Sequence, residues 1–182
     1  MSKKSKLYKI RRKLQVIALK LTSEKTMAKF YYFIRFKQKL NLKNPETFNE
    51  KLQWLILNYY PYDEKVIIGA DKYKVREYVK AKGLGYTLND LIGVWDSWEE
   101  LNWNTLPQQF ALKGNHGQGY NVICEDKSKI SEKEVQEKFN EWLAEDFGMF
   151  SGERHYSKIE PKILGEKFLG GDITDYKFYT FT

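Results

Sequence analysis

The N-terminal segment places apolar residues at helical spacing, with lysines and arginines between them. This pattern predicts an amphipathic helix. Two interpretations stay open. The basic face can lie on an anionic membrane, where each basic residue near the surface adds about 1 kcal/mol, or the apolar stripe packs on the protein's own domain. The stripe consists of Leu7, Ile10, Leu14, Ile17 and Leu21.

Four further helices are predicted from apolar periodicity and from residues that begin or end helices. The first is rich in Phe and Tyr. Asn44 as N-cap, with Pro45 in the first turn, begins the second. Gly83 ends the third, and Ser131 with Glu134 forms a capping box for the fourth. The predicted ranges are about 26–40, 44–56, 71–82 and 131–146.

Short apolar runs between turn residues predict strands. Helices that precede and separate such strands indicate an α+β fold, with a helical N-terminal region followed by a small mixed sheet. The last predicted strand runs into the end of the chain at Thr182, so we expect the fold to be cut short there. The predicted strands cover 91–95, 110–113, 120–124, 162–169 and 176–181.

Composition favours one folded domain, or one and a part, in 182 residues. The formal net charge is +7, but residues 1–20 hold eight lysines and arginines and no acid, so the rest of the chain carries −1. Nucleic acid is therefore not an expected partner. Cys124 is the single cysteine and fits a reducing compartment. We expect a cytoplasmic protein, peripheral at the inner face of the cell membrane if residues 1–22 bind lipid.

The segment 110–124 is the most informative for chemistry. An apolar strand ends in Lys113, and the glycine-rich turn 114–119 follows before the next strand begins. Glycines let backbone approach an oxyanion, so this hairpin is a candidate phosphate cradle. Many glycine-rich hairpin tips hold no ligand, and that alternative stays open. Neither a Gly-Lys-Ser/Thr motif nor a third glycine for a dinucleotide fingerprint is present.

Other combinations of reactive residues are weaker. The soft metal ligands His116, Cys124 and His155 match no zinc spacing, and no Ser-His-Asp set is evident. His155 is expected in a polar loop, in a surface or capping role. The carboxylates Glu166, Asp172 and Asp175 either hold Mg²⁺ on phosphates or are solvated loop charges.

Several of these segments, in this order, resemble one family. They are NPETFNEKLQWL (44–55), DKYKVREYV (71–79), LP and FALKGNHGQG (106–119), ERHY (153–156), PKILGE (161–166) and DYKF (175–178). Together they are similar to the TupA-like ATP-grasp proteins, which are named after teichuronopeptide biosynthesis and lie among genes for bacterial surface polysaccharides. The resemblance covers residues 41–182.

The resemblance implies a fold in which two α+β subdomains clasp ATP, and an enzyme that activates a carboxylate as an acyl phosphate for attack by an amine or similar nucleophile. By analogy Lys113 contacts the α and β phosphates. The resemblance also implies three further parts: a flexible lid over the phosphates, a hinge strand at the adenine and the strand after the hinge. These are His116, Gly117, Gln118 and Gly119 for the lid, Glu166, Lys167, Phe168 and Leu169 for the hinge, and Asp175 and Lys177 for the next strand.

The resemblance also divides the chain. Residues 1–40 form a basic and aromatic helical segment, 41–165 the first part of an ATP-grasp unit, and 166–182 the hinge with the start of an incomplete second subdomain. The Mg²⁺ ligands of the family are expected beyond residue 182, and the family usually has a small residue where Gln118 stands. The expected function is the ATP-binding portion of a ligase of capsule or teichuronopeptide-like biosynthesis, with an unspecified saccharide or carboxylate acceptor. The alternative is a glycosyltransferase-associated or non-catalytic protein of the same pathway.

Overall fold

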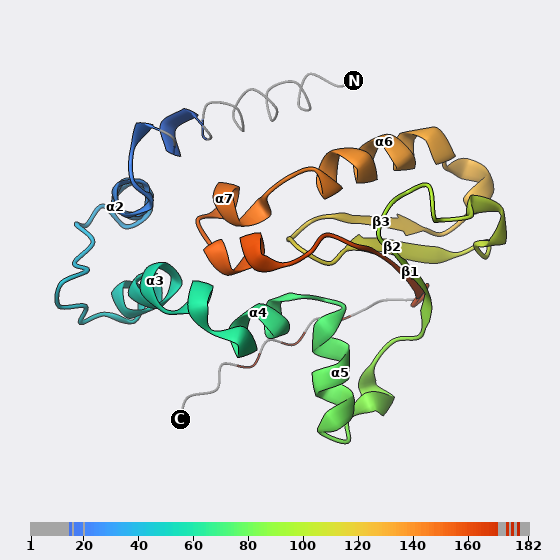
Figure 1. Cartoon of the computed structure of the whole chain (residues 1–182), viewed down its shortest axis with the longest axis horizontal. Coiled ribbons are helices and arrows are strands. Elements are labelled where there is room, and N and C mark those ends of the chain that lie inside the picture. Colours follow the sequence, from blue (N-terminus) through green and yellow to red (C-terminus); the bar gives the residue numbers. More distant parts are fainter. Residues whose placement is uncertain are drawn as a thin grey trace.

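The computed structural model describes residues 15, 17–19, 21–170, 174, 176 and 178. Helices dominate the first half of this part, and a sheet covered by one long helix forms the second (Figure 1). The helices are α2 (Glu24–Phe36), α3 (Phe48–Asn58), α4 (Glu64–Ala70), α5 (Lys74–Ala81), α6 (Glu132–Leu143) and α7 (Phe147–Ser151). The strands are β1 (Leu91–Trp95), β2 (Phe110–Gly114), β3 (Asn121–Cys124) and β4 (Ile163–Lys167).

The four strands form one sheet in the order β1-β4-β2-β3. Every neighbouring pair is antiparallel, so the prediction of a mixed sheet is wrong for the described strands. A short loop, residues 115–120, joins β2 to β3 as a hairpin, and a connection this short suits only antiparallel strands. β4 then enters between β1 and β2, antiparallel to both. The α+β class itself is confirmed.

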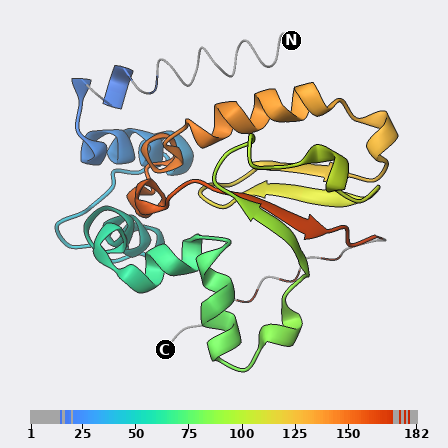
Figure 2. The same cartoon turned by 45° about the vertical axis from the view of Figure 1, so that its right-hand side comes forward.

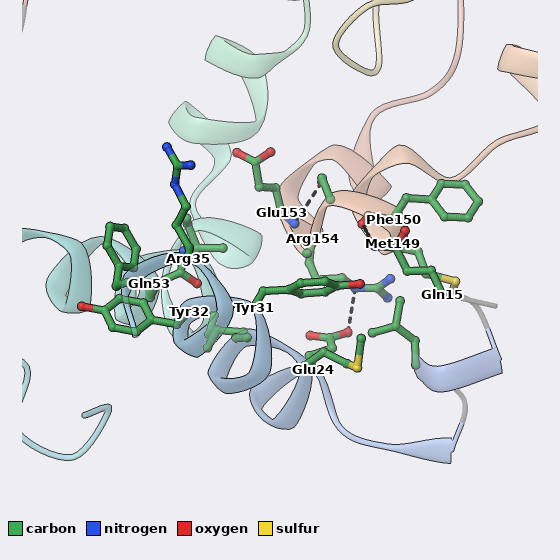
Figure 3. A pocket seen from close by; sticks show the side chains of 18 residues that line it. Gln15, Glu24, Tyr31, Tyr32, Arg35, Gln53, Met149, Phe150, Glu153 and Arg154 are labelled. Carbon is green, nitrogen blue, oxygen red and sulfur yellow. Dashed lines mark hydrogen bonds and ion pairs between the residues drawn. The ribbon is translucent and has the colours of Figure 1, made fainter. Parts of the chain in front are cut away.

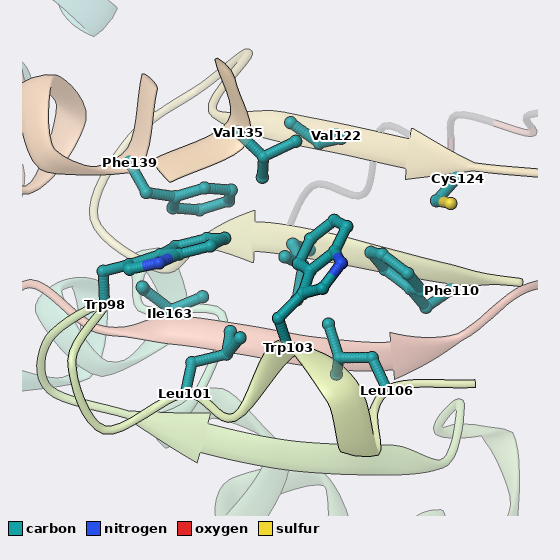
Figure 4. Close-up of a cluster of buried hydrophobic side chains, with 11 residues drawn as sticks. Trp98, Leu101, Trp103, Leu106, Phe110, Val122, Cys124, Val135, Phe139 and Ile163 are labelled. Atoms are coloured by element: carbon teal, nitrogen blue, oxygen red, sulfur yellow. The ribbon is translucent and has the colours of Figure 1, made fainter. Parts of the chain in front are cut away.

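One face of the sheet carries the hydrophobic core. Side chains of β2, β3 and β4 pack there against α6 and against the connection between β1 and β2 (Figure 4). Trp95 also lies on this face, where a Cβ on Gly165 would come within 2.9 Å of its ring. Glycine at that position therefore lets the indole lie flat on the sheet. The fully or nearly buried cluster includes Phe110, Leu112, Val122, Ile163, Val135, Phe139, Trp98 and Trp103.

The opposite face of the sheet is turned toward α4 and α5, which lie on the other side from α6 (Figures 1 and 2). Antiparallel register places Ala111 opposite Glu166 and Lys113 opposite Leu164. Because paired residues of antiparallel strands share a face, Lys113 and Glu166 both project toward α5. The polar site therefore lies on this second face.

The helix boundaries correct several predictions. Asn44 is not an N-cap: α3 begins after Thr47, whose Oγ1 accepts from the Glu50 amide at 3.3 Å while the Glu50 carboxylate accepts from the Thr47 amide at 3.0 Å. This reciprocal capping box prevails over the Asn-Pro signal. Ser131 does accept from the Glu134 amide, at 3.4 Å, which is one of the two hydrogen bonds of the predicted capping box. The helix predicted over 26–40 ends at Phe36, since Lys37 has a left-handed conformation.

Most of the N-terminal stripe falls outside the described residues, and so do Asp172, Asp175 and Lys177. Of the stripe, Ile17 and Leu21 are described, and both are exposed. The strand predicted over 176–181 lies largely outside as well. Among the helices of the described part, none has the length and apolar character needed to cross a membrane.

Candidate functional site

An ion pair between two strands is the centre of the polar face. Lys113 of β2 donates from Nζ to Glu166 Oε2 at 2.5 Å. Glu166 of β4 stands opposite Ala111, so it is the diagonal neighbour of Lys113, within reach of a long side chain. Lysine at the end of β2 and glutamate late in β4 therefore meet because of strand register. Both residues were predicted as site residues, and the structure brings them together.

Arg76 of α5 completes this cluster. Its Nη1 lies 3.3 Å from Glu166 Oε1, and its Nη2 donates to the carbonyl oxygen of Asn89. The side chains of Arg76 and Glu166 are each 10% exposed, whereas that of Lys113 is 32% exposed. A buried carboxylate is tolerable when cations and hydrogen bonds surround it. Glu166 is thus held from both sides, and Lys113 is the member of the cluster that an incoming ligand can reach.

The loop 114–119 follows Lys113 directly, and Lys72, which lies just before α5, binds it by hydrogen bonds. Lys72 Nζ donates to the Gly114 carbonyl at 3.0 Å and also to the Gly117 carbonyl. The amide of Lys72 donates to the Asn115 carbonyl at 3.3 Å. Burial, followed by the nearby Lys113 charge, lowers the pKa of Lys72, and Asp71 and Glu166 oppose this shift.

Asn115 ties this loop to two other segments. Its Nδ2 donates to Asp71 Oδ1 at 3.0 Å and to the Glu160 carbonyl at 2.9 Å, while its Oδ1 accepts from the Lys162 amide at 2.7 Å. The side chain is fully buried. Asp71 Oδ1 in turn accepts from the backbone amides of Tyr73 and Lys74, where α5 begins. The glycine loop, the start of α5 and the entry into β4 are therefore one hydrogen-bonded unit.

His116 anchors the loop from the opposite side. Its Nε2 lies 2.9 Å from the Trp142 carbonyl at the end of α6, and its ring is almost fully buried. Burial is the main cause that lowers the pKa of His116, so the neutral ring donates from Nε2. The role of a mobile phosphate lid, which the resemblance implied for His116, stays a prediction; in this structure His116 is a buried anchor.

The tip of the loop differs from its base. Gly117 lies beneath the rings of Tyr120 and Phe147, whereas Gln118 and Gly119 are exposed. Gln118 Nε2 reaches the Tyr156 hydroxyl at 3.5 Å. Within the described residues, the backbone N–H groups of residues 116–119 have no hydrogen-bond acceptor. Consecutive unpaired amides beside a lysine are donors from which an anion-binding nest can form.

The predicted hinge follows β4. Lys167 already uses both backbone groups, because its amide donates to Asp90 at 3.0 Å and its carbonyl accepts from Asn89 Nδ2 at 2.8 Å. Phe168 is half-buried and Leu169 is exposed. The Lys167 amide is therefore unavailable to a base at this hinge, so an amide donor must come from Phe168 or Leu169, while the Lys167 carbonyl oxygen keeps a second lone pair.

The structure also bears on two expectations, one about His155 and one about metal ligands. His155 was expected in a polar loop, but it is 6% exposed and its ring meets Tyr60 edge-on at 5.9 Å; burial lowers its pKa. Aromatic neighbours distant in sequence explain the error. Within the described residues no three His, Cys, Asp or Glu side chains come together as a potential metal site.

Sequence reasoning assigned no role to Lys72, Arg76, Asp71 and Asn115. Asp71, Lys72 and Arg76 are close in the sequence and all charged, which marks this segment as polar. Only Arg76 lies in α5, and Asp71 and Lys72 precede it. The sequence does not reveal that this segment is oriented toward β2 and β4.

A separate cavity of about 580 Å³ lies between α2, α3 and the segment that follows α7 (Figure 3). Tyr31, Tyr32 and other apolar side chains form most of its wall. Arg154 on its rim is neutralised by Glu24 at 3.0 Å. Burial raises the pKa of Glu153 on the same rim. The cavity is large enough for a small organic ligand.

Comparison with known proteins gives one result at the level of the family. No curated protein and no solved structure matches this chain significantly. The family model of TupA-like ATP-grasp proteins matches residues 50–182, which include most of α3, all of α4 to α7, the four described strands and the cluster around Glu166. The chain belongs to the TupA-like ATP-grasp family.

Proposed function

We propose that this chain is the ATP-binding portion of an ATP-grasp ligase that activates a carboxylate as an acyl phosphate. The observation that supports this most is Lys113, held by Glu166 at 2.5 Å and followed by a loop with unpaired amides. One fixed positive charge beside several N–H donors suits a polyphosphate better than it suits a neutral ligand.

In this proposal each residue has a distinct task. Lys113 contacts the α and β phosphates, and the amides of residues 116–119 approach them from the loop. Glu166 orients the Lys113 ammonium and is therefore a positioning residue. The backbone of Phe168 and Leu169 meets the adenine, and Lys177 follows on the next strand.

The reaction would begin when a carboxylate oxygen of the substrate attacks the γ-phosphorus and ADP leaves. A nucleophile such as an amine then attacks the acyl carbon, and inorganic phosphate leaves. Mg²⁺, when bound, neutralises the charge that develops on the phosphates. Family membership also motivates the proposed setting, which is the biosynthesis of bacterial surface polysaccharides such as capsule or a teichuronopeptide-like polymer.

Calorimetry with ATP tests the assignment of Lys113. Lys113→Ala should weaken binding about tenfold or more, because a hydrogen bond to a charged group contributes about 1.5–3 kcal/mol. Lys80→Ala is the matched control, since Lys80 is exposed on α5 and, among the described residues, pairs only with Glu77 one turn earlier. Equal ATP affinity in the wild type and Lys113→Ala would refute the assignment. ATP binding without turnover in the full-length protein would instead favour the non-catalytic alternative.

A further inference from the structure

The outer face of helix α2 leaves large apolar side chains exposed to solvent. α2 lies at one end of the molecule, away from the sheet (Figures 1 and 2). Phe30, Phe33 and Ile34 are 55%, 50% and 48% exposed. We propose that this stripe, with the lysines beside it, docks on an anionic lipid bilayer. The proposal does not depend on ATP binding.

Helical spacing separates two faces of α2. Because residues three and four apart share a face, Phe30, Phe33 and Ile34 form one stripe. None of the three lines the cavity between α2 and α3, which takes its α2 wall from another side of the helix. That wall includes Glu24, Tyr31, Tyr32 and Arg35 (Figure 3). The stripe is therefore not the face by which α2 packs on the protein, and an exposed apolar patch of this kind marks an interaction surface.

The charges of α2 are divided in the same way. Glu24 is the only acid among residues 24–40, and it lies on the cavity side, where it pairs with Arg154 at 3.0 Å. Lys25 and Lys29 are exposed and form no ion pair among the described residues. Lys25, Lys29 and Phe33 follow one another at intervals of four, so the lysines lie beside the stripe. Large apolar side chains flanked by lysines are typical of a helix that lies in a membrane interface.

The distribution of charge along the chain favours an anionic partner for this end of the molecule. Residues 1–20 hold eight lysines and arginines and no acid, and residues 21–40 add five against one acid, so residues 1–40 carry +12. Since the formal net charge is +7, residues 41–182 carry −5. A negatively charged surface attracts the first part and repels the second. It therefore orients the protein with α2 toward the surface.

A bilayer fits the stripe better than a nucleic acid does. Bases stack on flat aromatic rings, whereas this stripe includes the branched side chain of Ile34. Phe and Ile side chains can enter the boundary between headgroups and acyl chains, while lysines stay at the lipid phosphates. Basic residues and apolar anchors bind membranes more firmly together than either does alone. The basic residues 1–22 thus supply most of the charge, and α2 supplies the apolar contact.

Sedimentation of the whole chain with vesicles tests the proposal. The vesicles contain phosphatidylglycerol and phosphatidylcholine in equal parts, and vesicles of phosphatidylcholine alone are the comparison. The variant Phe30→Ser/Phe33→Ser removes two rings of the stripe, and serine has a helix propensity similar to that of phenylalanine. Tyr62→Ser/Tyr86→Ser is the matched control, since these tyrosines lie outside α2 and are 81% and 83% exposed.

A second pair of variants decides the question if the serines prevent folding. Lys25→Gln/Lys29→Gln removes the two cations beside the stripe. Lys133→Gln/Lys138→Gln removes two exposed cations from α6, so the net charge changes by the same amount. Circular dichroism of each variant without vesicles shows whether it is folded.

We expect each α2 variant to bind the anionic vesicles about tenfold or more weakly than the wild type. The serine variant loses the apolar area that the half-exposed rings would bury, and each lysine near an anionic surface contributes about fivefold. Both control variants should bind nearly as the wild type does, and vesicles of phosphatidylcholine alone should bind the wild type weakly.

Three results would overturn the proposal. The first is wild-type affinity of the folded Phe30→Ser/Phe33→Ser variant, even if removal of residues 1–22 abolishes binding. The second is an equal loss in both lysine variants, because net charge alone would then explain the attraction. The third is unchanged vesicle binding by the serine variant together with weaker binding to a single-stranded oligonucleotide or with dissociation of a dimer in analytical ultracentrifugation. The stripe would then contact a nucleic acid or a second copy of the chain.

Discussion

Gly117 offers a direct test of how the loop is packed. A Cβ at this position would lie 2.7 Å from Tyr120 Cε2 and 2.9 Å from Phe147 Cδ2. Both distances are shorter than real carbon–carbon contacts, and both neighbours are rings in a packed environment. Gly117 does not have a positive φ, so alanine is excluded by neighbours and not by the backbone. Overpacking of this kind costs typically about 1–3 kcal/mol, and we expect Gly117→Ala to reduce the free energy of unfolding by that amount.

Gly119→Ala is the contrasting variant. Gly119 has φ +76° and no atom within 4 Å of an added Cβ, so its cost comes only from the left-handed conformation, about 1–2 kcal/mol. Urea unfolding of the single variants and of each combined with Phe147→Leu separates the two causes. The smaller side chain should relieve part of the Gly117→Ala cost and none of the Gly119→Ala cost. The packing argument is refuted if Gly117→Ala is as stable as the wild type, or if Phe147→Leu relieves both variants equally.

Three further predictions follow from the described contacts and from the sequence. Arg76→Met should destabilise the fold in urea unfolding, toward the lower end of the about 3–5 kcal/mol typical of a broken buried pair, because Lys113 remains beside Glu166. Burial raises the pKa of Glu153. The contribution of this residue to stability is therefore complete below the unfolded pKa of about 4.3 and is lost as pH rises through the folded pKa. In thermal unfolding, Glu153→Gln should melt higher than the wild type at pH 7 and equally near pH 3. Deleting residues 1–22 should abolish sedimentation with anionic vesicles at low salt, and equal sedimentation of both chains would leave only the packed-helix interpretation.

The hairpin and its lysine could be predicted because their signals are local. A short apolar run, a lysine at its end and a glycine-rich turn all lie within 110–124, and β2 and β3 form there as expected. The start of α3 was mispredicted because two overlapping cap signals compete. Asn44 and Thr47 both suit an N-cap, and only the reach of the Glu50 side chain back to Thr47 decides between them.

The partners around Lys113 could not be predicted, because they come from distant parts of the chain. Glu166 lies 53 residues from Lys113, and Asn115 lies 44 residues from Asp71. Strand register brings the first pair together, and the packing of α5 on the open face of the sheet brings the second. The prediction of a mixed sheet failed for the same reason, because strand direction depends on where β4 inserts.

The glycines of the loop are required for reasons other than the phosphate contact that the sequence suggested. Gly117 is required by the rings of Tyr120 and Phe147, and Gly119 by a positive φ at the turn. Neither requirement involves a phosphate, so a glycine-rich hairpin alone is weak support for one. The support comes instead from what the glycines leave available: amides without acceptors, beside an ammonium that Glu166 holds in place. Since Lys72 and His116 fix the same loop from two sides, these amides are already arranged before any ligand arrives, and an anion that binds them need not supply the free energy to order the loop.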